Sequence, residues 1–554
     1  MLELPTDFYH MVCEELANRQ EFGTLFNCAL SGKILVGPAL LWLYSSEGND
    51  NDLTQNDTFQ GRLDAQKRTF LNWALQWKSI TRSSLGNTAY PYCLWIRSLD
   101  LRNLSYLLED NMFREAQESF FAEDMAGFLK APETPMKLKV RGAKAKKRLD
   151  IQSVLELIGE SITSFISEAA SQNRATVAVE DLSGDIRATV LPKWVSRMSK
   201  LKSMTLWDGG ALNADVAEAI TKSCHNFDDL TFYLCLADTD NDLAAFFRGL
   251  RQNSLRSFAA ISAASVGPQS LLSLNHHAQS LKRLKLDGLK LDAIKNLSYL
   301  QGCDRLESLE ISDADGTINL EATENDVYLE VVAWLSKCTS LRELLVRNFV
   351  SGPVILTEVC LSNNIRLQKL QVVGYPMVGN RDFHKALSHQ SNLESLELRA
   401  DPEGAFRDDI EDLITSISRL SKLKYLNLLS TSDYFRTQEI LALVPQLQNL
   451  EELWFGGYDV TDDIWHSMAN LHHLRALNIH AVTSFTSSGI LAYISTLQDT
   501  NQGMLLSVMA QSPEHGLTEV EEVTIRLGIA ARIDGRFEYT LYREIDSDAE
   551  SFSD

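Results

Sequence analysis

The sequence predicts an α/β solenoid built from one short unit that is repeated many times. An LxxLxL frame, with apolar residues at its first, fourth and sixth positions, begins at eleven places, and neighbouring frames are 24 to 35 residues apart. A period in the twenties with this spacing is the signature of leucine-rich repeats. We expect parallel strands on the concave face of a horseshoe and returning helices outside. The frames begin at Leu201, Phe227, Leu255, Leu281, Leu306, Leu341, Leu367, Leu393, Leu423, Leu450 and Leu474.

Composition and charge exclude several other classes of protein. The 554 residues carry a net charge of −22, which argues against nucleic acid as the main partner because phosphate binding needs a basic surface. No apolar run approaches the roughly 20 residues that span a bilayer. The first residues lack the basic and apolar regions of a secretory signal. We therefore expect a cytoplasmic and/or nuclear protein with no membrane partner.

The eight cysteines indicate neither a disulfide framework nor a zinc site, because no CxxC pair is present. Cys224, Cys303 and Cys338 each stand three residues before a frame. A small buried hydrophobic residue suits that position, at the end of the connecting helix. We predict a structural role for these three thiols and no metal or cofactor.

The first 45 residues predict a module of three short helices. Apolar residues recur at helical spacing from Phe8 to Leu16, again from Phe22 to Ala29, and once more after Pro38. The opening Leu4-Pro5, the stretch LFNCALS at 25–31 and PALLW at 38–42 resemble an F-box, and the segment is similar to those at the head of fungal F-box proteins. A tryptophan of the usual pattern is absent near residues 31–34. A plain helical cap that closes the end of the solenoid is the alternative.

The F-box resemblance implies docking on a Skp-family adaptor and, through it, on the cullin of a ubiquitin ligase. Some of the family's apolar positions must instead form the module's own core. Carried over by position, the implied adaptor contacts are Leu4, Pro5, Phe8, Val12, Leu16, Leu25 and Leu30.

The rest of the chain divides into a linker, the repeats and a tail. Residues 46–95 read as a polar linker followed by connecting helices, and the solenoid is expected over 96–543. Its first frame begins at Ile96, and the next strand is read at 174–179, so an insertion falls near 109–173. Seven basic residues at 137–148 make either a nuclear-import signal or a solvated loop. Asp534 and Gly535 predict a C-terminal capping hairpin, and residues 544–554 an acidic, disordered tail.

No catalytic constellation is present, so the repeat itself supplies the candidate site. Alternate side chains of a strand face opposite ways. The leucines therefore enter the core, and the residues between and after them reach the concave face. Large aromatic and basic residues there are typical of binding surfaces. The expected target-binding residues are Trp207, Tyr233, Arg283, Lys285, Arg347, Arg399, Tyr425, Trp454 and His480.

Together these features predict a non-catalytic receptor rather than an enzyme. The resemblance implies the substrate-recognition subunit of an SCF-type cullin–RING ubiquitin ligase, with the F-box on the adaptor and the repeats on an unknown protein target. A leucine-rich-repeat binding scaffold or inhibitor with no link to ubiquitin is the alternative. Co-purification with a Skp-family adaptor distinguishes the two.

Overall fold

The computed structural model describes residues 5–45, 59–130, 149–173, 176–235, 239–262, 266–401, 403–510 and 516–541. The chain divides into two compact units, Met1–Ile261 and Ser262–Asp554. Leu4, the basic stretch 137–148 and the tail 544–554 lie outside the described residues. The predictions made for these three segments therefore stay predictions.

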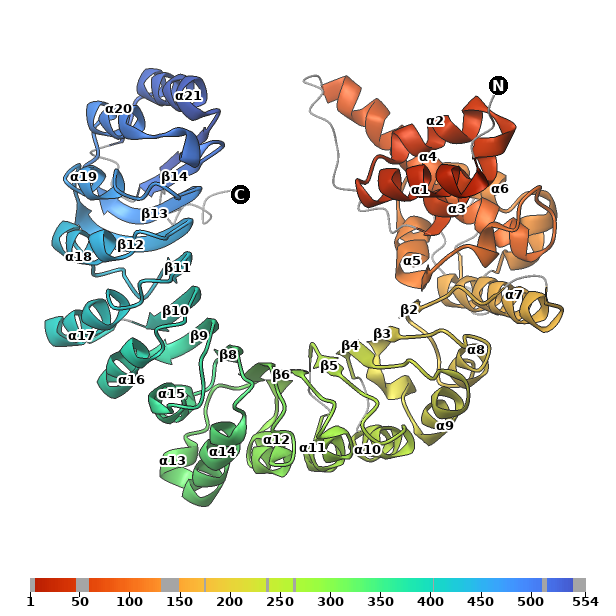
Figure 1. Ribbon diagram of the computed structural model, residues 1–554, viewed down its shortest axis with the longest axis horizontal. Helices are drawn as coiled ribbons and strands as arrows, with labels where there is room; N and C mark the ends of the chain where they lie inside the picture. Colours follow the sequence, from red (N-terminus) through yellow and green to blue (C-terminus); the bar gives the residue numbers. More distant parts are fainter. Residues whose placement is uncertain are drawn as a thin grey trace, which may run out of the picture. The chain divides into compact units, whose positions relative to one another are not determined.

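The first unit begins with helices and continues into the first five strands (Figure 1). Its helices are α1 (Thr6–Asn18), α2 (Phe22–Ser31), α3 (Lys33–Ser45), α4 (Phe59–Ser84), η1 (Tyr92–Leu94), α5 (Leu101–Glu109), α6 (Phe113–Phe120), η2 (Glu123–Phe128), α7 (Ile151–Ser171), α8 (Leu191–Val195), η3 (Gly209–Ala211), α9 (Ala214–Ser223) and α10 (Asp240–Gly249). Its strands are β1 (Ser98–Asp100), β2 (Asp181–Gly184), β3 (Ser203–Asp208), β4 (Asp229–Leu234) and β5 (Ser257–Ala260).

The second unit alternates strands and helices to its end. Its strands are β6 (Arg283–Leu289), β7 (Ser308–Asp313), β8 (Glu343–Arg347), β9 (Lys369–Pro376), β10 (Ser395–Asp401), β11 (Tyr425–Leu428), β12 (Glu452–Val460), β13 (Ala476–Thr483), β14 (Leu505–Ala510) and β15 (Arg536–Leu541). Its helices are α11 (Pro268–Leu274), η4 (Asn275–His277), α12 (Leu291–Ile294), η5 (Leu297–Leu300), α13 (Leu320–Thr323), α14 (Asn325–Lys337), α15 (Gly352–Leu361), α16 (Arg381–Ala386), η6 (Leu387–His389), α17 (Arg407–Ile417), α18 (Thr437–Leu443), η7 (Val444–Gln446), α19 (Ile464–Met468), α20 (Ser487–Thr496), η8 (Asp499–Asn501) and α21 (Glu519–Ile533).

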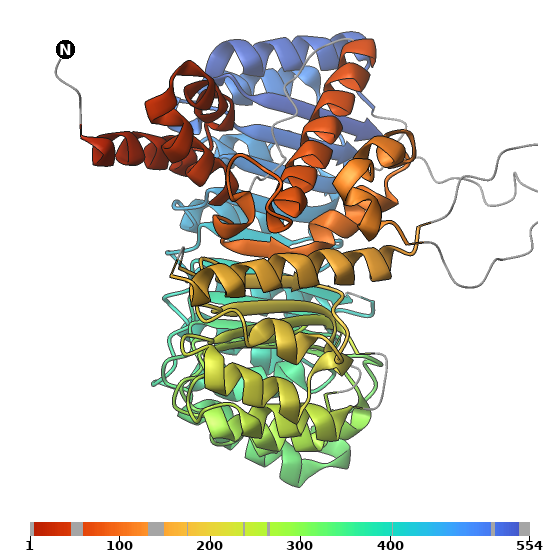
Figure 2. The ribbon, with the colours of Figure 1, turned by 90° about the vertical axis from the view of Figure 1, so that its right-hand side faces the viewer.

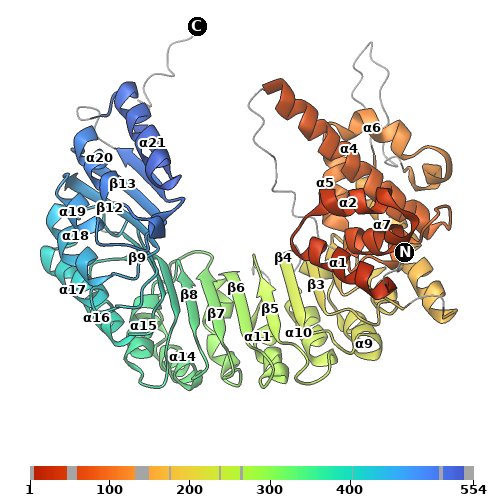
Figure 3. The ribbon, with the colours of Figure 1, turned by 45° about the horizontal axis from the view of Figure 1, so that its top comes forward.

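The strands confirm the predicted fold class. Within each unit the strands follow one another in chain order, and neighbouring strands pair in parallel, as β10 does with β9 and β11. Figure 3 shows β6 to β9 side by side, with α11, α14 and α15 along one side of them. The pairing keeps equivalent frame positions in register, so that Leu396 lies opposite Leu370 on one side and Leu426 on the other.

The leucines of the frame form the core of each repeat. Leu284, Leu396 and Leu426 are all buried, as expected for side chains that point from the strands towards the helices. Cys224, Cys303 and Cys338 are also fully buried, which confirms their structural placement. Burial raises the pKa of each of these thiols to about 12, so none is a reactive thiolate at neutral pH.

The region read as an insertion carries an essential part of the core. Figure 2 shows α7, in light orange, in line with the helices of the following repeats, and α7 packs against α8. The side chains of Val154, Ile158 and Ile162 on α7 are fully buried. The strand predicted at 174–179 is wrong, because β2 begins at Asp181 and its Leu182 lies opposite Leu99 of β1. The described parts of this region, with α6, η2 and α7, are thus the return path of the first repeat.

Replacing Gly159 with alanine is expected to destabilise the first unit by about 1–3 kcal/mol. A Cβ atom at this position of α7 would lie 2.3 Å from Cη2 of Trp194. The Trp194 indole has little room to move, because it is buried and its Nε1 donates a hydrogen bond to Glu160 Oε2 at 3.0 Å. Urea denaturation of the full chain measures the effect.

Gly23→Ala is the matched control for that substitution. Gly23 also lies within a helix, but no atom would come within 4 Å of its added Cβ. Alanine there should be neutral or stabilise by up to about 1 kcal/mol, because it reduces the freedom of the unfolded chain. Equal effects of the two substitutions would contradict the tight packing of α7 on Trp194.

The predicted C-terminal hairpin is wrong. Residues 519–533 form helix α21, and β15 then pairs in parallel with β14, as any other repeat strand does. Asp534 adopts the left-handed conformation, with φ of 51°, and caps the end of the helix. An Asp-Gly pair serves equally as a hairpin turn or as a helix C-cap, and here it is the cap.

Acid is expected to destabilise the second unit through His384. This side chain lies buried in α16, with its Nε2 3.2 Å from the hydroxyl of the buried Tyr375. Burial lowers the pKa of His384 from 6.5 to about 4, against a weaker opposing effect of Asp409 and Asp412. Well above pH 6.5 His384 is neutral in both the folded and the unfolded chain and costs no stability. As the pH falls from 6.5 towards 4, stability is lost, because the unfolded chain takes up the proton first.

The urea midpoint of the His384→Gln variant, followed from pH 7 to pH 4, checks this prediction. The variant should lose less stability over this range than the natural chain does. His389→Gln, which changes an exposed histidine of the same repeat, is the control and should keep the natural pH dependence. A parallel pH dependence of the His384 variant and the natural chain would contradict the assignment.

Candidate functional site

The helices α1, α2 and α3 form a small core of their own. Cys13, Ala17, Leu25 and Ala39 are buried at its centre, and partly buried side chains such as Leu16 pack around them. The module therefore uses only some of its apolar residues to fold.

Six large apolar side chains of this module are exposed to solvent, and we call them the apolar patch. Leu30 is 71% exposed and Met11 65%. Along α1 the patch residues recur at intervals of three and four, and on α2 they stand four apart, so each helix presents them on one side. Such exposure of large apolar groups on a small module is typical of a binding surface. The patch consists of Phe8, Met11, Val12, Phe26, Leu30 and Ile34.

The structure separates the predicted adaptor contacts into two groups. Phe8, Val12 and Leu30 belong to the apolar patch, and Pro5 is exposed at the N-terminus of α1. Leu16 packs against the core, whereas Leu25 is fully buried. The side chain of Leu25 therefore supports the module, and its assignment as an adaptor contact is wrong. Met11, Phe26 and Ile34 were missing from the predicted contacts, although Met11 and Phe26 follow the helical spacing of their helices.

The open face of each strand, opposite the helices, carries the predicted target-binding residues. In the first unit two of them, Trp207 and Tyr233, form together with Arg102 of α5 the group that we call the Trp207 platform. The Trp207 and Tyr233 rings stack with their centroids 5.6 Å apart and an interplanar angle of 29°. The Arg102 guanidinium carbon lies 5.9 Å from the Tyr233 ring centroid, and Arg102 donates a hydrogen bond of 3.2 Å to the Tyr233 hydroxyl.

Sequence reasoning missed Arg102, although it directly follows Leu101, the sixth position of the first frame, as Trp207 follows Leu206; in the structure Arg102 lies in the first turn of α5. Asp100 caps this helix by accepting from the backbone N–H of Arg102, and it also forms an ion pair with the Arg102 side chain at 3.1 Å. The hydrogen bond to Asp100 raises the pKa of Arg102. The cap thus holds the guanidinium over the neighbouring strands.

The predicted basic residues of the second unit form ion pairs on the open face. Glu310 lies between Lys285 and Arg347, at 2.8 Å from the Lys285 Nζ and in contact with the Arg347 guanidinium. Arg399 pairs with Glu397 at 2.8 Å. These charges are mutually neutralised, which leaves less free positive charge on this face than the sequence indicates. Arg283 is exposed at the start of β6.

Tyr425, Trp454 and His480 lie further along the same unit and are only half-exposed. Trp454 is placed between Asn427 and Asn478 by the pairing of β11, β12 and β13. The Trp454 Nε1 and the Asn478 Nδ2 are covered by neighbouring atoms and have no hydrogen-bond partner among the described residues. Burial lowers the pKa of His480, so its imidazole is neutral at pH 7.

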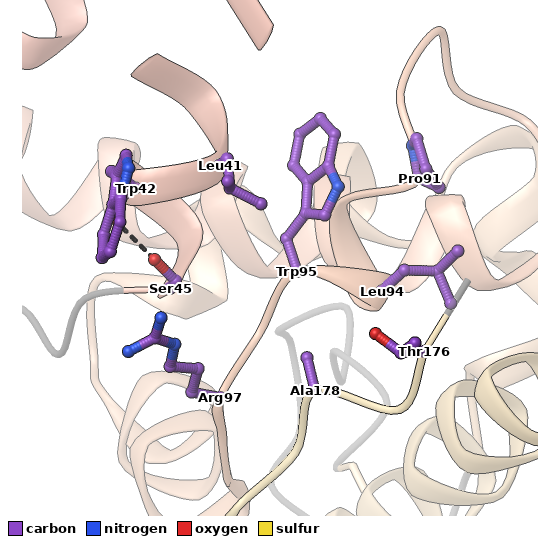
Figure 4. Close-up of a pocket in the computed structure, with 9 residues that line it drawn as sticks. All are labelled: Leu41, Trp42, Ser45, Pro91, Leu94, Trp95, Arg97, Thr176 and Ala178. Atoms are coloured by element: carbon purple, nitrogen blue, oxygen red, sulfur yellow. Dashed lines mark hydrogen bonds between the residues drawn. The ribbon is translucent and has the colours of Figure 1, made fainter. Parts of the chain in front are cut away.

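A cavity of about 390 Å³ lies where α3 meets the first repeat (Figure 4). Figure 4 shows the side chains of Trp42, Trp95 and Arg97 around it, together with smaller apolar groups. The Arg97 guanidinium carbon lies 5.2 Å from the Trp42 ring centroid. The Tyr44 and Tyr92 rings also pack together, with their centroids 4.6 Å apart. These aromatic contacts join the three-helix module to the repeats within the first unit.

The feature that defines the fold is the repeated pairing of buried apolar frame residues on parallel strands that alternate with helices. The chain has the leucine-rich-repeat fold. Within its described ranges, no group of three or more His, Cys, Asp and Glu side chains is placed to hold a metal. No described helix combines the length and the hydrophobicity that crossing a bilayer requires.

Comparison with known proteins adds only distant structural likenesses. No family model and no curated protein matches the chain. Among solved structures, it is similar to yeast Rad7 in complex with Elc1, with 13% identity and a TM-score of 0.38 over 67% of this chain and 93% of that one.

The chain is similar at the same level to two further solved structures. TLR13 in complex with the RNA ssRNA13 has 14% identity and a TM-score of 0.35, over 60% of this chain and 47% of that one. An internalin (InlF) of Listeria monocytogenes has 14% identity and a TM-score of 0.31, over 60% and 92%. Sequence identities and TM-scores this low carry no information about the partners or the activity of this chain.

The geometry of this leucine-rich-repeat protein is suited to holding other proteins. The apolar patch on α1–α3 can bury hydrophobic surface, and the open strand faces offer aromatic and charged groups in rows.

Proposed function

We propose that this chain is the substrate-recognition subunit of an SCF-type cullin–RING ubiquitin ligase, acting in the cytoplasm and/or nucleus. Helices α1–α3 dock on a Skp-family adaptor through the apolar patch, and the open strand faces bind the target protein. The subunit carries out no chemistry. It raises the effective concentration of target lysines near the ubiquitin-conjugating enzyme.

The apolar patch is the observation that carries this proposal. A module that only capped the solenoid would turn its apolar side chains towards the repeats. Here Met11 and Leu30 are largely exposed, although the module's own core around Cys13 and Leu25 is complete. Leaving six large apolar groups in water costs solubility, which is tolerable when a partner covers them.

The joint between module and repeats also supports a receptor role. A ligase must hold its target at a fixed distance from the bound enzyme. The contacts of Arg97 with Trp42 and of Tyr92 with Tyr44 connect α3 to the segment that leads into β1. Packing of this kind resists bending better than a bare linker does.

Reconstitution tests the proposed assembly. The purified full chain is mixed with a recombinant Skp-family adaptor and a cullin–RING pair, and the mixture is separated by size-exclusion chromatography. We expect all components to elute as one complex, and Trp207→Ala on the open face to leave the elution unchanged. Elution of the chain apart from the adaptor would reject the ligase role and leave a binding scaffold or inhibitor as the function.

A further inference from the structure

Four large apolar side chains are exposed where the chain leaves four neighbouring strands of the second unit, β9 to β12 (Figure 1). Three lie in the loops that follow β9, β10 and β11, and the fourth lies at the irregular end of β12. All four therefore belong to the edge at which these parallel strands end. Phe406 is 71% exposed and Tyr434 57%. We call this group the edge row, and it consists of Val378, Phe406, Tyr434 and Tyr458.

Contacts between successive loops make the edge row continuous. A Cβ atom at Gly404 would lie 3.8 Å from Val378 Cγ2, which brings the loops after β9 and β10 together. The Thr431 hydroxyl, after β11, accepts a hydrogen bond of 2.8 Å from a backbone N–H of β10. The Tyr458 N–H of β12 donates a hydrogen bond of 2.7 Å to the Phe435 carbonyl. The four segments thus form one connected surface.

The exposed side chains of the edge row are not part of an incomplete core. The loops after β9 and β11 bury the neighbouring Met377 and Phe435, and β12 buries Val460. In the loops on either side, after β8 and β13, the aromatic residue is buried, with Phe349 at 5% and Phe485 at 6% exposure. The edge row is therefore confined to β9–β12. Large apolar groups gathered at one place on a surface are typical of a binding site.

The same edge carries negative charge that is not neutralised. Five carboxylates of these segments are exposed, and none of them forms an ion pair with a described residue. The nearby cations at the starts of α16 and α17 are already paired, Arg381 with Asp412 at 2.7 Å and Arg407 with Glu411 at 3.0 Å. Only Arg436 adds a positive charge to the segments themselves. The five carboxylates are those of Asp401, Glu403, Asp433, Asp459 and Asp463.

Local hydrogen bonds leave this charge in place. Asp401 accepts from the Glu403 backbone N–H at 2.9 Å, and Asp463 accepts from the Thr461 hydroxyl at 3.1 Å. Both donors are uncharged, so neither neutralises a carboxylate. Nucleic acids and anionic membranes would bring their own negative phosphates to this edge and be repelled. A peptide with apolar and basic side chains satisfies the aromatic rings and the carboxylates together.

The length of the edge row sets the size of this peptide. Neighbouring strands are about 4.8 Å apart, so four of them span roughly 15 Å. About ten residues of a helix or five residues of an extended segment cover this distance. A short segment can therefore contact all four members of the row.

We propose that the edge row binds a short basic segment of the partner protein. Its apolar side chains pack on Phe406 and Tyr434, and its lysine or arginine side chains face the surrounding carboxylates. This deepens the proposed function, because it adds the edge of β9–β12 to the open strand faces as target-binding surface. It rests on that function only in treating the partner as a ubiquitination target.

Titration calorimetry with a defined probe tests the proposal. The probe is an acetylated and amidated peptide of three Lys-Leu-Arg-Gly repeats. One counterpart carries glutamine in place of the basic residues, and a second carries glycine in place of leucine. We expect the full natural chain to bind the probe at least tenfold more tightly than either counterpart. Equal affinity for the probe and the leucine-free peptide would overturn the proposal, since it would show attraction by charge alone.

Two double variants locate the binding site. Phe406→Ser/Tyr434→Ser should weaken binding of the probe about tenfold. Asp433→Asn/Asp459→Asn should weaken it severalfold and reduce its salt dependence. All four side chains are exposed, so the variants should fold. Asparagine also tolerates the positive φ of 58° at Asp459.

Two matched variants separate this site from general attraction to an acidic protein. Val520→Ser/Leu527→Ser removes two exposed apolar side chains of α21, and Glu321→Gln/Asp326→Asn removes two exposed carboxylates of α13 and α14. Both should bind the probe as the natural chain does. Weakening by either control that equals that of its counterpart at the edge row would overturn the proposal.

Adaptor binding of the natural chain is measured in parallel. Binding of the probe at the edge row without binding of the adaptor would reject the ligase role alone. Binding of the adaptor without binding of the probe would reject this inference alone.

Discussion

A chain that carries Met11→Asp and Leu30→Asp is expected to lose roughly a hundredfold or more in affinity for a Skp-family adaptor. Both side chains are more than 60% exposed, so the module should fold with either aspartate. An interface that covers them would have to bury two unpaired charges, which costs several kcal/mol. Calorimetry with the purified adaptor measures the affinity, and circular dichroism checks the helices.

The control for this double variant is Val520→Asp. Val520 is even more exposed, at 77%, but lies on α21 in the second unit. The Val520→Asp variant should bind the adaptor as the natural chain does. Unchanged adaptor affinity in the Met11/Leu30 variant would show that the apolar patch is not the docking surface.

Leu396→Ala is expected to destabilise the second unit by about 2–5 kcal/mol. Leu396 is fully buried in β10 and lies between Leu370 and Leu426 of the neighbouring strands. Parallel strands held in register by backbone hydrogen bonds cannot close around the missing atoms, so a cavity remains. Urea denaturation gives the free energy of unfolding.

Arg399→Ala on the same strand is the contrasting variant. Its side chain lies on the open face, half-exposed, and forms an ion pair with Glu397. An exposed pair of this kind contributes about 1 kcal/mol or less. A cost similar to that of Leu396→Ala would contradict the division of each strand into a core side and an open side.

The repeat frame predicted the fold because its leucines occupy the same buried position in each repeat. The prediction of individual strands failed where a residue of another kind stands at a frame position. Strand β14 was missed because Gly503 occupies the position three residues before the buried Leu506, where the frame expects an apolar residue. Strand β2 was read early because Val177 and Val179 mimic the frame, although Leu182 is the residue in register.

The candidate site was predictable as a face but not as a set of interactions. Alternation along a strand placed Trp207 and Tyr233 in one row, as their stacked rings bear out. The contribution of Arg102 depends on a helix cap made by Asp100, which no strand pattern contains. The ion pair of Arg347 with Glu310 joins two residues that are 37 positions apart in the chain and lie on neighbouring strands.

The adaptor surface shows the same limit in the helical module. Helical spacing groups apolar residues on one stripe, but it does not tell which side of the stripe faces the other helices. Leu25 and Leu30 both belong to α2, yet one is fully buried and the other is largely exposed. Only the packing of the three helices around Cys13 and Ala39 separates core from patch.

Binary binding of the natural full chain to a purified Skp-family adaptor tests the central claim most directly. The account predicts a 1:1 complex in titration calorimetry, with a dissociation constant in the micromolar range or tighter, and co-elution of the two proteins on a sizing column. An absence of heat together with separate elution, from a chain whose helices and thermal transition are intact, would contradict it.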